Sequence, residues 1–495
     1  MSEVQRHRHA RRRHTLILSD VHLSQAHPED PADPLWMRYR RREHHPDSDF
    51  AAMVDHLLAT TTDDDAIELV FNGDVLDFDA PWVKDGQSSF DELPSTEAGC
   101  LVQVKLLLAD HVVWFSAVAR LLLAGHRLLI VSGNHDVELY WPAVRSTIRQ
   151  ELLRLCTVEA ARAIDDDEAS DIDSRVRFRA WFHVTEDRIY IEHGSQYDIL
   201  NGVRHAMIPL TRERDRIHPM CGKLAFRRTG SRMGYFNPYY EETFYLGFFG
   251  YLNHFLRFYA FSRKSIGRVW FVGAVRSVLE IFRHRHRDER LDEGRTLAQA
   301  ETGATPEAID ATHALRVRPA EDTMLPILRE LWLDRIFLFF GMVLVLAVIA
   351  VLAPWKTAGI ALGVMLGLFV IYELVTPKPD LRTYDQAPPT VLEIFDIHGV
   401  RAICMGHTHR PFSRWIDGKF HGNSGSWCPA FRDIECTQPQ LDGRPVLMLT
   451  ARDGSLHGGL HWFRDGALVP DAEGCVSGKM EIVSEKTGEG VSVGV

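Results

Sequence analysis

Five short motifs along the chain place aspartate, asparagine or histidine where a short apolar run has just ended. They offer nitrogen and oxygen donors without a thiolate, and such a set suits hard or borderline divalent cations such as Mn²⁺, Fe²⁺ or Zn²⁺. One histidine at such a position is more often structural, but five motifs in series predict a metal centre. The motifs are Asp20-Val-His22, Gly73-Asp74-Val-Leu-Asp77, Gly133-Asn134-His135-Asp136, His193-Gly194 and Gly406-His407-Thr408-His409. The predicted metal ligands are Asp20, His22, Asp74, Asn134, His193, His407 and His409.

The spacing within two of these motifs indicates how the ligands could be shared. Asp20 and His22 are two residues apart, so they leave an extended strand on the same side and can bind one ion together. His407 and His409 share that spacing across a turn and can reach two neighbouring ions. Two cations about 3.5–4 Å apart would lower the pKa of a water between them and favour in-line attack on phosphorus. Negative charge on the phosphoryl oxygens would meet a fixed cationic pair.

Three further residues of the motifs are expected to act beside the ions. His135 follows a predicted ligand and is placed to protonate the leaving oxygen as a general acid. Asp136, the second predicted catalytic residue, either orients His135 or caps the N-terminus of a helix, and both interpretations stay open. Asp77 is expected to stabilise its own turn or a histidine near the metal rather than to bind an ion.

Elements of an α/β sheet must hold these motifs. Short runs of branched and aliphatic residues predict buried strands, and longer patterned stretches between them predict helices. In such a sheet the active site lies beyond the carboxyl ends of the strands, which is where every motif falls. The expected strands are Thr15–Leu18, Ile67–Phe71, Leu128–Val131, Ile189–Ile191 and Ala402–Met405. The expected helices are Phe50–Ala59, Val102–Leu123 with a stop at Gly125, and Thr390–Ile397 after Pro388 and Pro389.

The ordered motifs resemble the calcineurin-like metallophosphoesterase superfamily, whose signature is DxH, GDxxD, GNH(D/E), a later histidine and GHxH. The match covers residues 15–200 and 395–430. The resemblance implies an α/β metallophosphoesterase β-sandwich flanked by helices, and two divalent ions, with Mn²⁺ expected and Fe²⁺ or Zn²⁺ as alternatives. By position it implies one ion held by Asp20, His22, Asp74 and His409. It implies a second ion held by Asp74, Asn134, His193 and His407, so that Asp74 bridges the pair.

Within that superfamily the chain looks like the UDP-2,3-diacylglucosamine pyrophosphatases. The shared features are Asp20-Val-His22-Leu23, Gly406-His407-Thr408-His409-Arg410-Pro411 and a long segment between His193 and His407, where that family carries a helical lid for acyl chains. That family usually has arginine after the motif asparagine, whereas this chain has His135. The resemblance therefore implies a lipid-linked phosphate or pyrophosphate substrate, with a UDP-diacylglucosamine-like molecule as one candidate.

The long inserted segment has three parts with different compositions. The segment Tyr235–Phe261 holds 13 Phe or Tyr in 27 residues. This composition predicts a lipid-binding lid, or else a packed subdomain close to the membrane, or a dimer interface. Ser262–Arg290 is rich in arginine, with Trp270, Phe271, Ala274, Val278 and Ile281 at helical spacing, and could rest on anionic lipid headgroups. Glu293–Glu321 is expected to be a loop or linker, as is the acidic stretch Asp165–Asp173.

Two uncharged runs then predict a membrane-spanning hairpin. Ile336–Trp355 and Thr357–Tyr372 are separated only by Lys356, and runs of 18–20 apolar residues are typical of transmembrane helices. Gly341, Gly359, Gly363 and Gly367 are possible close-packing points. Because the flanks carry Arg329, Arg335, Lys378 and Arg382, the positive-inside rule predicts a two-helix protein of the cytoplasmic membrane with its catalytic domain in the cytoplasm.

The charge, the cysteines and the N-terminal composition limit the classes of partner and of targeting signal that can be expected. The formal net charge of −11 argues against a nucleic-acid partner, because phosphate backbones favour a basic face. The seven cysteines include no CxxC pair, so neither a zinc cluster nor a disulfide framework is indicated. No apolar stretch follows the Arg- and His-rich first fourteen residues before the first strand, so we expect no signal peptide. Oligomeric state has no signal in the sequence.

These observations predict six segments: 1–13 a basic tail, 14–200 the first half of a catalytic domain, 201–330 a helical aromatic and basic insertion, 331–376 a transmembrane hairpin, 377–468 the second half, and 469–495 a flexible C-terminal tail. The expected function is hydrolysis of a phosphodiester or pyrophosphate bond in a lipid-linked substrate at a lipid bilayer. One alternative is a soluble nucleotide or phosphoprotein substrate, with the hairpin only as an anchor. Another is a non-catalytic membrane scaffold, which would predict missing ligands.

Overall fold

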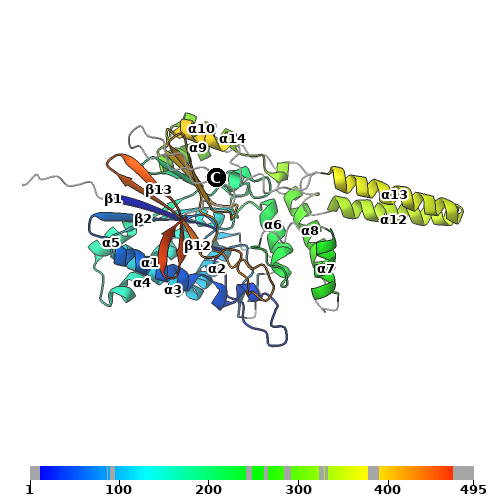
Figure 1. Cartoon of the computed structure of the whole chain (residues 1–495), viewed down its shortest axis with the longest axis horizontal. Helices are drawn as coiled ribbons and strands as arrows, with labels where there is room; N and C mark the ends of the chain where they lie inside the picture. The colour runs from blue at the N-terminus through cyan, green and yellow to red at the C-terminus, as the bar shows by residue number, and fades with distance from the viewer. Residues whose placement is uncertain are drawn as a thin grey trace, which may run out of the picture.

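The computed structural model of the protein describes residues 12–85, 87–89, 95–240, 248–260, 266–283, 291–322, 328, 333–376 and 389–471. Within them the chain forms two large mixed β-sheets surrounded by helices, and a pair of long helices that projects away from the sheets (Figure 1). The expected α/β class is confirmed at this level. A small hairpin of β3 (Val83–Lys84) and β4 (Gln87–Ser88) stands apart from both sheets.

The larger sheet brings three motif-bearing strands side by side. Its order is β14-β13-β12-β1-β2-β5-β6, and β1, β2, β5 and β6 run parallel. Because parallel strands end at the same edge, the motifs that follow β1, β2 and β5 meet there. β12 joins β1 in the antiparallel direction, so the end of the chain completes this sheet. The strands are β1 (Arg12–Leu18), β2 (Asp65–Asn72), β5 (Arg127–Val131), β6 (Val176–Arg179), β12 (Arg444–Arg452), β13 (Ser455–Arg464) and β14 (Ala467–Pro470).

The second sheet joins segments from opposite ends of the insertion. Its order is β10-β11-β9-β8-β7, and β8 pairs in parallel with β9, with Ile189 opposite Ala402. The histidine motifs that follow β8 and β9 therefore leave the sheet at the same edge. The strands are β7 (Phe182–Val184), β8 (Ile189–Glu192), β9 (Ala402–Met405), β10 (Phe412–Ile416) and β11 (Lys419–Asn423).

Alternation along the strands divides the core into two layers. Successive side chains of a strand point to opposite faces, so Ile17, Val70 and Leu129 join one buried cluster and their neighbours join another. The first cluster also contains residues of the second sheet, such as Ile191 and Cys404, so the two sheets share it. The second cluster lies against the helices and includes Leu16, Leu69, Leu128, Phe50 and Trp114.

The helices beside the larger sheet differ from the sequence prediction at one point. The expected single helix Val102–Leu123 is two helices that meet at an angle of 82°. His111 stands at the break, and its ring nitrogens lie 3.0 Å from Asp47 Oδ2 and 2.9 Å from the Ser24 carbonyl. The hydrogen bonds of this buried ring fix a corner that hydrophobic periodicity cannot reveal. The helices are α1 (Asp47–Thr60), α2 (Glu97–Asp110), α3 (Val112–Leu123) and α4 (Pro142–Ala160).

Two segments that were expected to be loops are helical, and one expected helix is divided in two. Glu293–Glu321 contains α9 (Leu291–Thr302) and α10 (Pro306–Leu315), because its alanines favour a helix and Ala298 and Ile309 reach the core. The acidic stretch Asp165–Asp173 forms most of α5 (Asp166–Ser174), which Asp165 caps. The expected helix Thr390–Ile397 is divided into α14 (Pro389–Leu392) and α15 (Ile394–His398).

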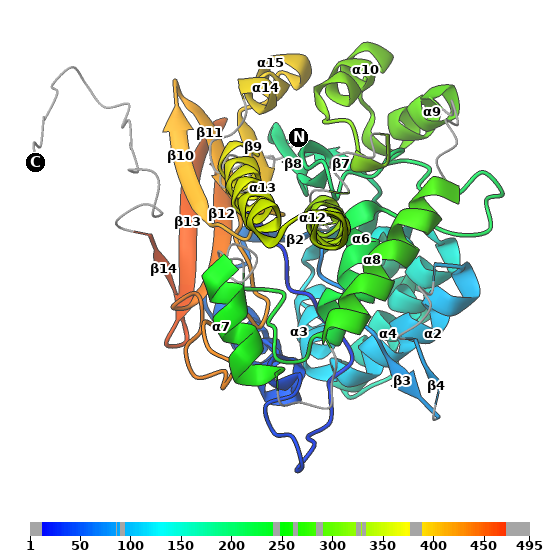
Figure 2. The ribbon, with the colours of Figure 1, turned by 90° about the vertical axis from the view of Figure 1, so that its right-hand side faces the viewer.

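The insertion contributes three helices near the base of the projecting pair. They are α6 (Cys221–Arg228), α7 (Phe248–Phe258) and α8 (Ile266–Arg283). The projecting helices are α12 (Leu333–Leu352) and α13 (Trp355–Val375), and both are long and apolar enough to cross a membrane. Figure 2 looks along this pair, and Figure 1 shows α8 beside its base. Among the described atoms, nothing lies within 4 Å of a Cβ built on Gly341, Gly359, Gly363 or Gly367, so these glycines are not close-packing points within the chain.

The chain ends differ in part from the predicted boundaries. Arg12 and Arg13, assigned to the basic tail, belong to β1, where Arg13 pairs with Ala451 of β12. Residues 1–11 of that tail and 472–495 of the predicted C-terminal tail lie outside the described residues, and so do Arg329, Lys378 and Arg382. Six of the cysteines are buried and form no disulfide among the described residues, and Cys475 lies outside those residues.

Candidate metal centre

The predicted ligands stand on strained turns at the carboxyl ends of the strands. Asp20, His22, Asp74, His407 and His409 all have a positive φ, between 52° and 70°. Non-glycine residues rarely adopt this conformation, which costs of order 1–3 kcal/mol each and collects at functional sites. Five such residues from three separate turns mark this edge of the sheets as the candidate functional site.

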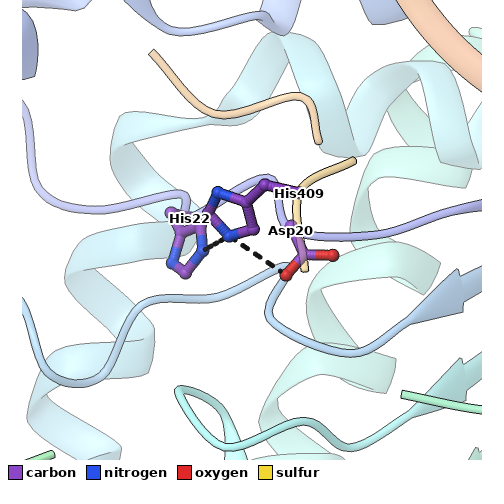
Figure 3. Close-up of side chains that lie close together, drawn as sticks. All are labelled: Asp20, His22 and His409. Carbon is purple, nitrogen blue, oxygen red and sulfur yellow. Dashed lines mark hydrogen bonds and ion pairs between the residues drawn. The ribbon is translucent and has the colours of Figure 1, made fainter. Parts of the chain in front are cut away.

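The first group of side chains joins the two ends of the chain. Asp20, His22 and His409 each present a donor atom within 4.8 Å of the others (Figure 3). The Nε2 atoms of His22 and His409 are 3.3 Å apart, and His409 Nε2 is 3.3 Å from Asp20 Oδ1. Two histidine nitrogens and a carboxylate oxygen that face one point suit a divalent cation.

The second group lies beside the first. Asp74, His193 and His407 form another set with donor atoms within 4.8 Å of one another. His193 Nε2 lies 3.2 Å from Asp74 Oδ2 and 3.2 Å from Asn134 Oδ1, so the amide also reaches this group. All seven side chains proposed from the sequence thus converge at this edge, and Asp74 also shares a group with His22 and His135.

Hydrogen bonds behind two histidines set which ring nitrogen is available. His193 Nδ1 lies 2.9 Å from the carbonyl of Asn72, so its Nε2 faces Asp74 and Asn134. His407 Nε2 lies 2.9 Å from Asp198 Oδ2, which leaves Nδ1 for a ligand. Such bonds orient metal-binding histidines and fix their tautomers. Asp198 was not singled out in the sequence, because no motif marks it.

The buried carboxylates of Asp20 and Asp74 have the charge and the oxygen donors that a bound cation would require. Asp20 Oδ1 is buried, and its contact in the described part of the chain is the His409 ring nitrogen at 3.3 Å, without a hydrogen bond of regular geometry. A buried carboxylate oxygen is costly unless it is well paired, and a cation would satisfy it. Burial raises the pKa of Asp74, but His193, His135 and His22 outweigh that effect and hold its pKa well below its ordinary value. Asp74 is therefore an anion in this setting. Asp20 has a lowered pKa as well, because His409 and His193 outweigh its burial.

Close backbone approaches keep the turns together. A Cβ on Gly73 would overlap the His193 ring, and a Cβ on Gly133 would overlap the Asp74 carboxylate. Gly73 also has a φ of +82°, which favours glycine. The two motif glycines are thus required by space, and they allow neighbouring turns to bring their side chains to one point.

His135 sits between the ligands and a pair of buried carboxylates. Its backbone N–H donates to Asp74 Oδ1 at 2.7 Å, and its Nδ1 lies 3.1 Å from Asp77 Oδ1 and 3.2 Å from Asp79 Oδ2. Burial lowers the pKa of His135, but Asp74, Asp79 and Asp77 outweigh it and raise the pKa to about 10. A bound cation would work against this rise, because it disfavours a second positive charge nearby. The Nδ1 contacts leave Nε2 as the nitrogen that can face a substrate.

Asp77 and Asp136 hold turns. Asp77 Oδ1 accepts the backbone N–H groups of Asp79 and Ala80 as well as the His135 contact. Asp136 is buried and accepts from Gly133 N at 2.6 Å and Val75 N at 3.0 Å, so it ties two motif turns together. It makes no capping bond to the short 3₁₀ helix that it precedes. The capping interpretation of Asp136 is therefore wrong for that helix.

The insertion adds side chains that the sequence motifs did not indicate. Lys223 of α6 is buried, and its Nζ lies 2.8 Å from Asp79 Oδ1 and 2.7 Å from Glu138 Oε1. Tyr239 donates its hydroxyl to Asp77 Oδ2 at 2.7 Å, and its ring centroid lies 4.9 Å from that of His22. The insertion thus reaches the carboxylates behind His135. A lysine in a basic segment carries no sequence signal for such a contact.

The loop after β11 supports the opposite side of the centre. Asn423 donates its side-chain N–H to the carbonyl of Gly406 at 2.6 Å, next to the histidine motif. Ser426 donates its hydroxyl, and Trp427 its backbone N–H, to the carbonyl of Asp20, at 2.9 and 3.1 Å. The segment Asn423–Trp427 therefore acts as a structural turn under two predicted ligands.

No family model matches the chain, and no curated protein matches its sequence. The site consequently rests on its own geometry. That geometry shows a mixed α/β protein with several buried groups of histidine and aspartate that could hold metal ions.

Proposed function

We propose that the protein is a membrane-anchored phosphoesterase that uses two divalent metal ions, with the β-sandwich of the calcineurin-like metallophosphoesterases. The observation that carries the proposal is the side-by-side position of two donor groups, one with Asp20, His22 and His409 and one with Asp74, His193 and His407. These residues come from both ends of the chain and from both sheets, and a purely structural role would not require so many strained turns at one edge.

The chain's own side chains supply the remaining steps. When bound, a pair of divalent ions activates a water and neutralises charge on the phosphoryl oxygens. His193 and His407 are held by Asn72 and Asp198, so their free nitrogens are oriented before a ligand arrives. His135, with Nδ1 engaged by Asp77 and Asp79, donates a proton from Nε2 to the leaving oxygen.

Two features favour a lipid-linked substrate. Aromatic side chains of the insertion stand beside the centre: Tyr239 contacts His22, and the Phe226 ring centroid is 5.3 Å from that of His135. The insertion also connects the centre to α12 and α13, which suit a bilayer. Burying acyl chains under an aromatic lid would contribute about 0.8 kcal/mol per CH₂. A phosphodiester or pyrophosphate such as that of a UDP-diacylglucosamine-like molecule fits this combination, with the catalytic domain on the cytoplasmic side of the membrane.

Hydrolysis by the purified full chain tests this proposal. We expect the chain with Mn²⁺ to cleave a chromogenic phosphodiester or a lipid pyrophosphate, and Asp74→Ala to abolish cleavage. Asp396→Ala is the matched control, because Asp396 is exposed and lies in α15, outside both donor groups. A chain with intact ligands that cleaves no phosphoester with any divalent ion would contradict the proposal.

Substrate preference separates the lipid proposal from its alternative. A variant lacking residues 331–375 should lose activity on the lipid pyrophosphate much more than on a soluble phosphodiester. Equal retention on both substrates would instead favour a soluble nucleotide or phosphoprotein substrate, with the hairpin serving as an anchor alone.

A further inference from the structure

Helix α8 has two faces of opposite character. Ala274, Ser277 and Ile281 recur at intervals of three and four residues, are buried and face α6. The Ser277 hydroxyl bonds to the carbonyl of Leu224 in α6 at 3.4 Å. Helical spacing places the residues between these on the opposite side, so α8 turns a second stripe away from the protein.

The outward stripe of α8 is apolar with arginines at its edge. Phe271, Leu279 and Phe282 lie at positions i, i+8 and i+11 on this stripe, and Leu279 and Phe282 are 52% and 54% exposed. Arg276 and Arg283 are also exposed, and their spacing of seven residues puts both along one side of the stripe. Phe271 was expected to share the apolar face of Ala274 and Ile281, but it lies on the exposed side. A contiguous exposed apolar stripe is unusual for a surface that meets only water.

The base of the projecting pair fixes where this stripe lies. Leu333, the first residue of α12, is buried in one cluster with Ala274 and Ile281 of α8 and with Leu224 of α6. Phe337, four residues later, is 59% exposed. At 1.5 Å per residue, the lipid-like surface of α12 begins about 6 Å beyond the contact with α8. Figure 1 shows α8 beside the base of the pair.

A polar collar marks the same level. Tyr372 of α13 donates its hydroxyl to Asp334, and Arg335 pairs with Asp334 at 3.3 Å. Tyrosine and arginine at the end of an apolar helix are typical of the boundary between membrane and water. The α8 stripe is thus at the depth where headgroups would lie if α12 and α13 cross a bilayer.

We infer that α8 is an interfacial membrane helix, whose Phe271, Leu279 and Phe282 enter the headgroup region of a bilayer while Arg276 and Arg283 meet anionic lipid phosphates. The inference rests on the proposed membrane anchoring by α12 and α13. An apolar stripe bordered by arginine is the pattern by which helices lie in a membrane surface. A bilayer is the occupant that fits this position, because α8 shares a buried cluster with Leu333 at the start of the apolar helix α12.

One consequence concerns the metal centre. Helix α6 packs against α8, and its Lys223 pairs with Asp79 behind His135. Packed helices are separated by about 8–10 Å. One helix, α6, therefore stands between Asp79 and the proposed membrane surface at α8.

Site-specific fluorescence in vesicles tests the inference. The full chain carrying Leu279→Cys is labelled with a polarity-sensitive probe and placed in phosphatidylcholine–phosphatidylglycerol vesicles, with the labelled native chain as the blank for its own cysteines. Val158→Cys in α4 is the water-exposed comparison, since Val158 is 58% exposed, and Leu366→Cys in α13 reports on the anchor. We expect nitroxide lipids labelled near the headgroup to quench Leu279 at least about threefold more than Val158.

The three positions separate the possible failures. Quenching at Leu366 with none at Leu279 would overturn the inference about α8 and leave the anchor standing. No quenching at Leu366 would overturn the anchor and the inference together. If the protein is a dimer and the probe at Leu279→Cys is shielded from water but not quenched by lipid, the stripe contacts a second copy of the chain. That result would overturn the inference. Phe282→Cys gives an independent repeat at the same face.

Discussion

The ammonium group of Lys223 lies 2.8 Å from Asp79 and 2.7 Å from Glu138, and all three side chains are buried. Lys223 belongs to the insertion, whereas the two carboxylates belong to the first half of the catalytic segment. Burial lowers the pKa of Lys223, but the two carboxylates outweigh it and raise the pKa above its ordinary value. The lysine therefore remains charged and joins the insertion to the turn that holds His135.

Replacing Lys223 with methionine should destabilise the protein strongly. Glu138 would lose its ammonium partner and Asp79 would keep only His135, and breaking a buried ion pair on one side costs about 3–5 kcal/mol. Thermal unfolding of the full chain in detergent measures this as a fall in Tm. Lys419→Met is the matched control, because its pair with Asp396 is exposed and should contribute less than about 1 kcal/mol. Equal effects of the two substitutions would refute the buried-pair account.

A methyl group on Gly133 should disturb the metal centre more than the fold. The added Cβ would overlap the Asp74 carboxylate, so Gly133→Ala must displace a residue shared by the predicted ion sites. We expect Mn²⁺ affinity to fall by about 10–100-fold, as for losses of groups that orient ligands. Isothermal titration measures the affinity, and Gly341→Ala, which meets no described atom within 4 Å, should leave it unchanged. Unaltered affinity in Gly133→Ala would place Asp74 outside the site.

Loss of His135 should depend on the leaving group. If His135 protonates the leaving oxygen, His135→Gln should slow hydrolysis of an alkyl or phenyl ester by about 10²–10⁴-fold. A nitrophenyl ester should be affected far less, because nitrophenolate leaves without a proton. Paired kcat values for the two substrates test this, with bound metal measured in parallel. An equal loss for both substrates at unchanged metal content would assign His135 a positioning role.

Acid should destabilise the fold through His421. This ring is buried on β11, and burial, with a smaller effect of Arg414, lowers its pKa to about 3. In the unfolded chain the His421 ring binds a proton below about pH 6.5, whereas in the folded chain it stays neutral until about pH 3. The contribution of His421 to the free energy of unfolding is therefore complete above pH 6.5 and is lost as the pH falls toward 3. The loss approaches about 1.4 kcal/mol per pH unit for one histidine. In His421→Gln the unfolding free energy should fall less steeply with pH, by the contribution of about one proton.

The strands could be predicted well because their signals are local. Each expected strand coincides with an observed one within two or three residues, for example Ala402–Met405 with β9. Buried strands in such a sheet are continuous apolar runs, and that pattern needs no tertiary information. The two apolar helices were equally clear, since length and lack of charge decide them.

The features that were missed depend on tertiary contacts. The corner at His111 arises from hydrogen bonds to Asp47 and Ser24, residues far away in the sequence. The helices α9 and α10 contain many polar residues, and their few buried side chains, such as Ala298, leave little periodic signal. Lys223 resembles any basic residue until α6 is placed against Asp79.

Mn²⁺ stoichiometry of the purified full chain tests the central claim most directly. Equilibrium titration followed by electron paramagnetic resonance should show two ions per chain that are coupled to each other, and Asp74→Asn should lose that coupling. The double variant His22→Gln with His409→Gln should retain one ion. A folded native chain that binds no transition metal, or keeps coupled ions after Asp74→Asn, would contradict the account.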